Sequence, residues 1–261
     1  MANISEIFKN ALTYPTTDIK ALIILGILFV INGLSSVLID FGFNTTGYVS
    51  LVLGLVTIIV SIIISGYEIS VIKEGIEKGT GIPQIDPMKN FVDGIKVVIL
   101  NIVYYIIPTI ITFILLFATG TINAIVNILM FYSNNSINAT LPSQYVSSLI
   151  TGGAVTGIIA AILFIVFALL CIIGTARFAK YDSLSEGISI GEVIKDIGTI
   201  GWGSYIVWFI VYIIISIILA MILGLIIAYV PYIGNLIGLL IITPFIALFA
   251  NRAIGELYSE I

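Results

Sequence analysis

The sequence predicts an all-α integral membrane protein with six transmembrane helices, arranged as three hairpins that are each preceded by a short cytoplasmic amphipathic helix. Three observations lead to this fold class. Of the 261 residues, 60% are hydrophobic and only 9% are charged, whereas an ordinary soluble domain carries about 25% charged residues. The charges are gathered into a few segments, and all the basic residues fall on one side of the resulting topology. This composition excludes a soluble globular protein.

The long uncharged stretches define the transmembrane segments. Residues 21–39, 41–67, 97–176 and 197–251 carry no charge, and a helix needs about 20 apolar residues to cross the hydrocarbon core. In lipid, each backbone N–H and C=O group must find its hydrogen-bond partner within the protein, and a helix provides this within one segment. These stretches are therefore predicted as helices. The last stretch divides near Pro231 and Gly234, which together signal a turn. The predicted spans are 21–39, 48–66, 97–119, 152–174, 204–228 and 232–250. Residues 120–132 either extend the third helix or lie on the outer surface.

The basic residues set the orientation, because Lys and Arg are enriched in cytoplasmic loops. All ten lie on one side of the six-span topology, so we expect a plasma-membrane protein with both termini in the cytoplasm. They are Lys9, Lys20, Lys73, Lys78, Lys89, Lys96, Arg177, Lys180, Lys195 and Arg252. The outer loops contain three Asn-x-Ser/Thr triplets, beginning at Asn44, Asn134 and Asn138. These triplets are either glycosylation acceptors or chance matches in polar loops.

An internal threefold repeat organises the chain, which we expect to form a single membrane domain over 1–261. An apolar i, i+3, i+4, i+7 stripe, typical of an amphipathic helix, precedes the first, third and fifth spans. The stripes are Ile4, Ile7, Phe8 and Ala11; Met88, Phe91, Val92 and Ile95; and Ile190, Val193, Ile194 and Ile197. The approximate repeat units are 1–83, 84–187 and 188–261.

Several segments resemble a known family of membrane proteins. The most specific is Phe91-Val92-Asp93-Gly94-Ile95-Lys96 followed by Pro108, and the stretch from Gly66 to Lys73 is also similar. The sequence resembles, over essentially its whole length, the archaeal multi-pass membrane family registered as domain of unknown function 4013. The resemblance implies a six-helix type of membrane protein, and it implies no activity, substrate or catalytic residue.

The residues that common catalytic chemistry requires are missing from the sequence. The chain has no histidine, which is the commonest general base and metal ligand. No predicted span contains an Asp or Glu for an aspartyl dyad, and no phosphate-binding loop is present. Cys171 lies among apolar neighbours, where a thiol is usually inert. We therefore expect a protein that is not an enzyme and has no cofactor and no metal. The net charge of −4 also argues against nucleic acid as a partner.

Polar residues in and beside the spans are the remaining candidates for function. Asn32, Asn101, Tyr104 and Tyr105 form a candidate polar cluster within the membrane, although amides there commonly hold helices together. Glu68, Arg177 and Arg252 lie at the inner ends of the second, fourth and sixth spans. They are either ordinary boundary charges or a charged inner vestibule in which Glu68 pairs with the arginines.

Two functions follow from these candidates. The first is a non-enzymatic membrane scaffold or assembly factor, whose partners are membrane lipids and other membrane proteins. The alternative is a passive conduit or lipid-handling protein with a pathway between the repeats, which a cavity lined by the polar cluster would favour.

Overall fold

The computed structural model describes residues 3–135 and 139–261. All the regular secondary structure assigned to these residues is helical. Its contacts divide the chain into two compact units, residues 1–100 with 172–261 and residues 101–171, where the sequence predicts one membrane domain. The helices α5 (Pro87–Ala118) and α7 (Ser143–Tyr181) each contribute to both units. The triplets beginning at Asn134 and Asn138 lie partly outside the described residues.

The first unit begins with short helices and a sharp bend. Its first elements are α1 (Ile4–Thr13), η1 (Tyr14–Thr16), α2 (Ile19–Asn32), α3 (Leu34–Asp40) and α4 (Tyr48–Ile76). The Asn3 side chain accepts a hydrogen bond from the Glu6 amide and caps α1, and Asp18 caps α2 in the same way. The chain turns by 80° between the two caps, from the α1–η1 segment into α2. α1 is therefore directed away from the line of α2.

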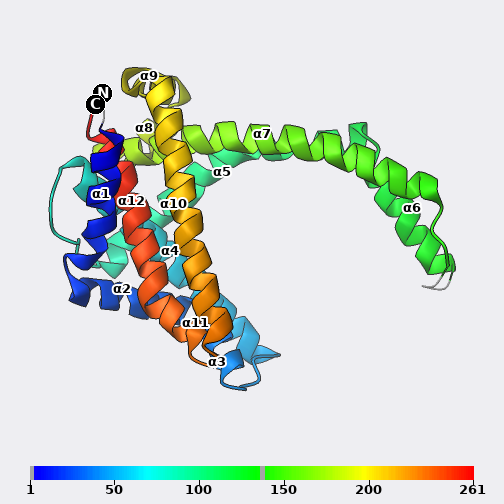
Figure 1. Cartoon of the computed structure of the whole chain (residues 1–261), viewed down its shortest axis with the longest axis horizontal. Coiled ribbons are helices and arrows are strands. Elements are labelled where there is room, and N and C mark those ends of the chain that lie inside the picture. The colour runs from blue at the N-terminus through cyan, green and yellow to red at the C-terminus, as the bar shows by residue number, and fades with distance from the viewer. Residues whose placement is uncertain (1–2, 136–138) are drawn as a thin grey trace. The chain divides into compact units, whose positions relative to one another are not determined.

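The remaining helices of the first unit run to the C-terminal end of the chain. They are α8 (Leu184–Gly187), α9 (Ile190–Ile200), α10 (Trp202–Tyr229), α11 (Gly234–Ile237), η2 (Gly238–Ile242) and α12 (Thr243–Tyr258). α12 is central, because it contacts α4, α1, α2 and α10. α1 lies beside α12 in Figure 1, so the two ends of the described chain meet within this unit.

Within the described residues, five helices are long and apolar enough to cross a membrane, or six if the bent segment Ile4–Asn32 counts as one span. Five predicted spans correspond to α4, α5, α7, α10 and the continuous segment Gly234–Tyr258. The predicted first span, 21–39, falls on α2 and α3, which are separated at Gly33. α2 alone has 14 residues, fewer than the roughly 20 that a straight span needs.

In the second unit, α5 ends close to the end of the third predicted span, and a separate helix follows it. Gly120 takes the left-handed conformation (φ 73°) and separates α5 from a new helix, α6 (Thr121–Asn134). Residues 120–132 therefore do not extend α5. Thr119 shares hydrogen bonds with Thr121 and, at 3.0 Å, with Thr156 of α7. These hydroxyl contacts fix the junction of α5 and α6 against α7.

Aromatic rings and close backbone approaches form the core of the first unit. Trp208 of α10 is fully buried and stacks with Phe8 of α1 and Tyr212, and Phe249 of α12 completes the group. α4 crosses the first turns of α5 so closely that neither Gly66 nor Gly94 has room for a side chain. Small residues permit such close contacts between membrane helices.

The three predicted amphipathic stripes differ in what they bury. In α1 the apolar residues Ile7, Phe8 and Ala11 are buried, and in α9 Val193 and Ile197 are buried. The second stripe forms no separate helix, since residues 88–95 are the first turns of α5. Of its apolar side chains, Met88, Val92 and Ile95 are exposed and Phe91 is half-buried, whereas Asn90 and Asp93, on the opposite face, are buried.

The last span contains a π-helical turn, η2, directly before Pro244. Proline has no amide hydrogen to donate to the carbonyl four residues earlier, which here belongs to Leu240. In η2 the Thr243 amide instead reaches back five residues to the Gly238 carbonyl. The Leu240 backbone packs directly against Gly26 of α2, where a Cβ atom would overlap it.

Candidate functional site

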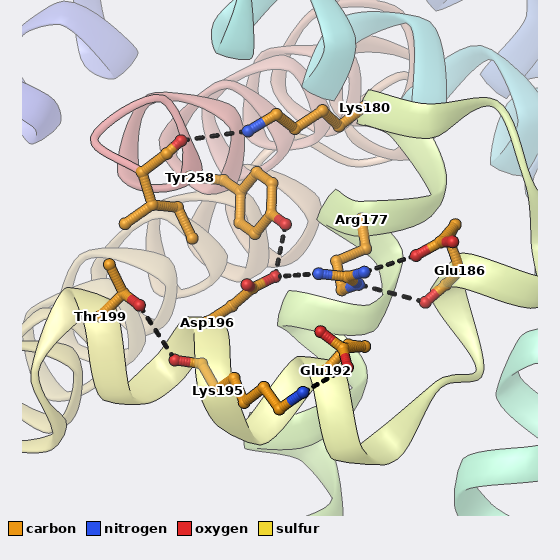
Figure 2. Close-up of polar contacts among 9 residues, drawn as sticks. Arg177, Lys180, Glu186, Glu192, Lys195, Asp196, Thr199 and Tyr258 are labelled. Carbon is orange, nitrogen blue, oxygen red and sulfur yellow. Dashed lines mark hydrogen bonds and ion pairs between the residues drawn. The ribbon is translucent and has the colours of Figure 1, made fainter.

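Arg177, near the end of α7, is the centre of a charged cluster in the first unit (Figure 2). Its Nη2 atom lies 2.5 Å from the Glu186 carboxylate, and its Nη1 atom lies 2.6 Å from the Asp196 carboxylate. Its Nε atom donates to the Glu186 backbone carbonyl. The Tyr258 hydroxyl donates to the same Asp196 oxygen at 2.5 Å. The guanidinium therefore holds α7, α8 and α9 together, and the bond from Tyr258 to Asp196 adds α12.

Burial explains why this arginine needs two carboxylates. The Arg177 side chain is only 6% exposed, and a buried charge is tolerated only when it is paired and hydrogen-bonded. Lys180, one turn later in α7, donates to the Ile261 backbone carbonyl at 3.0 Å, as Figure 2 also shows. The buried guanidinium is thus paired with two carboxylates. We call Arg177, Glu186, Asp196 and Tyr258 the Arg177 cluster.

Arg252 of α12 has a second, separate set of partners. Its Nε and Nη2 atoms donate to the same Glu256 oxygen at 2.9 and 2.6 Å. Its Nη1 atom donates to the Gly79 carbonyl at 2.7 Å. The guanidinium also lies 4.7 Å from the centre of the Tyr14 ring, a cation–π distance. Arg252 therefore fixes the loop after α4 and the segment after α1 to the last helix.

The structure does not bring Glu68 to either arginine among the residues it describes. Glu68 lies in α4, where its carboxylate is close to the Asn251 side-chain amide and to the Tyr212 phenol. The predicted vestibule joins all three charges, whereas here Arg177 and Arg252 take other carboxylates as partners. Glu68 is instead a polar group within the helical bundle.

The four residues of the predicted polar cluster divide between the two units. Asn32, in the first unit, accepts a hydrogen bond from Ser61 at 2.8 Å, and its backbone carbonyl accepts one from Thr57. These bonds attach the end of α2 to α4. Amides that bond across helices in this way commonly stabilise packing.

Asn101, Tyr104 and Tyr105 belong to the second unit. The Asn101 amide oxygen accepts a hydrogen bond from the Cys171 thiol at 3.3 Å. Tyr104 is fully buried, and the Tyr105 ring stacks on Phe164 at 6.1 Å. Asn101 and Tyr105 therefore contribute to contacts within this unit.

A polar hollow of about 550 Å³ opens in the first unit beside Arg252. Its walls come from α1, η1, the loop after α4 and the last turns of α12, and Arg252 and Glu256 lie in its lining. Among the described residues, no group of three His, Cys, Asp or Glu side chains could hold a metal ion. The hollow offers hydrogen-bonding groups and charge to a ligand.

Sequence reasoning found the two arginines but missed their partners. Glu256 could have been found, since it follows Arg252 by four residues and such pairs meet on a helix surface. Glu186, Asp196 and Tyr258 carry no comparable signal, because their contacts with Arg177 depend on how four helices pack. The hollow has no signature in the sequence for the same reason.

The long apolar helices and the buried charges at their ends define the class of protein as a multi-pass helical membrane protein. Residues 49–228 match the family described as "Protein of unknown function (DUF4013)", and the chain belongs to this family. The match includes the segment from Phe91 to Lys96 that carries the resemblance. No curated protein and no solved structure shows significant similarity to the chain.

Proposed function

We propose that this protein is a non-enzymatic membrane scaffold or assembly factor that holds partner proteins at the cytoplasmic side of the plasma membrane. The observation that carries the proposal is that the two buried arginines are used as structural ties. Arg177 joins α7 to the carboxylates of α8 and α9, and Arg252, paired with Glu256 of its own helix, joins α12 to the Gly79 carbonyl after α4. A surface built from such ties has a fixed shape, as a docking platform requires.

The proposed arrangement keeps the three repeats, with a hairpin in each and both termini in the cytoplasm. Its support is the one-sided distribution of Lys and Arg and the similar buried faces of α1 and α9. Cysteines placed at Asn44 and Lys78 in a Cys171→Ala background test the orientation with a membrane-impermeant thiol reagent. We expect labelling from outside at Asn44 alone. Labelling at Lys78 from outside would overturn the topology.

Purification in native nanodiscs tests the scaffold role. We expect a partner protein in fixed stoichiometry, because an assembly factor holds its partner in the resting membrane. Asp196→Asn, which breaks the Arg177 cluster, should release that partner, whereas the exposed neighbour substitution Lys195→Gln should retain it. A partner that remains in both variants, or a protein that purifies without one, contradicts the proposal.

The competing function is a passive conduit or lipid-handling protein, and it is favoured by the polar side chains of Asn101 and Tyr105 within a transmembrane helix. Reconstitution into vesicles separates the two functions. Lipid scrambling or solute flux that requires the protein, together with purification free of partners, would establish the conduit and refute the scaffold.

A further inference from the structure

The polar hollow beside Arg252 is lined by hydrogen-bonding groups that suggest a function in addition to the scaffold role. This function does not depend on the scaffold role. Five charged side chains lie in its lining, and the carboxylates outnumber the cations. The carboxylates are Glu6, Glu256 and Glu260, and the cations are Lys78 and Arg252. The lining therefore carries a net negative charge, although it contains two basic residues.

Both cations of the hollow are already engaged, and each contacts only one oxygen of its partner. Lys78 lies 3.6 Å from the Oε1 atom of Glu260. Arg252 directs both Nε and Nη2 to the Oε1 atom of Glu256 and directs Nη1 to the Gly79 carbonyl. A carboxylate offers about four lone-pair positions on its two oxygens. Acceptor capacity therefore remains in the hollow after these ion pairs are made.

The hydroxyl groups in the wall add further acceptors. Thr13 donates its hydroxyl proton to backbone carbonyls of α1 at 3.0 and 3.1 Å, and Thr17 donates to the Tyr14 carbonyl at 2.7 Å. A hydroxyl has one proton to donate and two lone pairs. These two threonines consequently present lone pairs to a ligand in the hollow. The wall therefore presents these acceptors beside the amide and hydroxyl groups of Asn10 and Thr80.

Burial makes the Glu256 carboxylate the strongest element of this site. Glu256 is 8% exposed, and it lines the hollow from the last helix. Charge-assisted hydrogen bonds to a carboxylate are about twice as strong as neutral ones, and they are screened less when the group is withdrawn from water. A cation that also donates hydrogen bonds matches both properties.

We propose that the hollow is a binding site for a primary ammonium group carried on a flexible chain. The ammonium would donate to Glu256 and to the threonine oxygens, and Glu6 at the rim would contact the chain or a second amine. A volume of about 550 Å³ admits such a chain, since small-molecule sites begin near 300 Å³. The ammonium comes from a soluble polyamine or from the headgroup of phosphatidylethanolamine.

Calorimetric titration of spermidine into the intact protein, in a non-ionic detergent, tests the site. We expect binding that weakens with added salt. Glu6→Gln should weaken it about threefold, as for an exposed ion pair, and Glu256→Gln about tenfold. Glu192→Gln is the matched control, because Glu192 is also an ion-paired glutamate but does not line the hollow. Glu6 is exposed on α1, so its variant remains informative if Glu256→Gln does not fold.

Nanodiscs distinguish the two sources of the ammonium. Phosphatidylethanolamine should compete with spermidine if the headgroup occupies the hollow, whereas phosphatidylcholine, which has no N–H donor, should not. An absence of competition by either lipid assigns the site to a soluble amine. The proposal is overturned if spermidine does not bind in detergent, if the Glu6 and Glu256 variants bind as the control does, or if inorganic phosphate binds in its place.

Discussion

Replacing Gly66 with alanine should separate two helices that are in direct backbone contact. A Cβ atom at position 66 would lie 2.6 Å from the Gly94 nitrogen and closer still to the Asn90 carbonyl oxygen, although Cβ contacts in proteins essentially never fall below 3.0 Å. Asn90 and Gly94 are four residues apart, so this carbonyl and amide form one helical hydrogen bond of α5. The new methyl group would press on the backbone of α5, which cannot move aside as a flexible side chain can.

The cost follows from the competition between helix propensity and overpacking. Alanine in a helix interior is about 1 kcal/mol better than glycine, and overpacking a close contact costs typically 1–3 kcal/mol. Because the contact is backbone against backbone, we take the upper end and expect a net loss of about 2 kcal/mol. Gly54 lies in the same helix, and a Cβ there meets no atom within 4 Å. Gly54→Ala should therefore retain or raise stability.

Thermal unfolding in detergent, followed by tryptophan fluorescence, measures the difference. A loss of about 2 kcal/mol corresponds to a decrease in Tm of roughly 4–8 °C for a protein of this size. Gly94→Ala should produce a similar decrease, because a Cβ there would overlap the Ile62 carbonyl of α4. The reasoning fails if Gly66→Ala melts at the same temperature as Gly54→Ala.

The ion pairs and the buried polar face make two further predictions for the same assay. Arg177→Gln and Asp196→Asn should each destabilise the protein, and the double variant should cost less than their sum because the two residues share one contact. Additivity of these two substitutions would contradict the Arg177 cluster. The effects of Glu68→Gln and Arg177→Gln, in contrast, should be additive. Asn90→Ala should lower the free energy of unfolding by about 1–3 kcal/mol, since its side chain accepts the Asp86 amide in a buried position, whereas Val92→Ala, at an exposed position, should cost about 0.5 kcal/mol or less. Equal losses at the last two positions would show that the face is assigned wrongly.

The long helices could be predicted because charge is excluded from the hydrocarbon core, and gaps between charges are visible in any sequence. The break at Gly33 could not be predicted, since no charged residue lies near it and the sequence fits either a continuous or a divided helix. The left-handed turn at Gly120 is similar. Glycine permits that conformation without requiring it. The sequence therefore does not decide whether residues 120–132 extend the third helix, whereas the structure places α6 there.

The buried face of the first turns of α5 shows where the amphipathic-stripe rule, which describes soluble proteins, fails in this protein. The stripe rule assumes that apolar side chains turn toward the core, but here Met88, Val92 and Ile95 are exposed. The buried Asn90 and Asp93 instead find hydrogen-bond partners in the Asp86 amide and the Lys96 side chain. The pairing of Arg177 could not be predicted for a different reason, because Coulomb attraction selects the carboxylates that packing places nearby, and Glu186 and Asp196 come from separate helices.

The π-helical turn before Pro244 means that the last span holds one residue more than an ordinary helix would place over the same length. Each residue of an α-helix rotates the chain by about 100°, and the wider turn absorbs the rotation of this extra residue. In a regular α-helix with the same number of residues, Gly234–Leu240 would be rotated by about 100° relative to Arg252 and Glu256. Gly26 would then meet a different part of the backbone. The width of this one turn therefore preserves the register between the two ends of the span, and the insertion of a further residue here should be far less tolerated than a substitution.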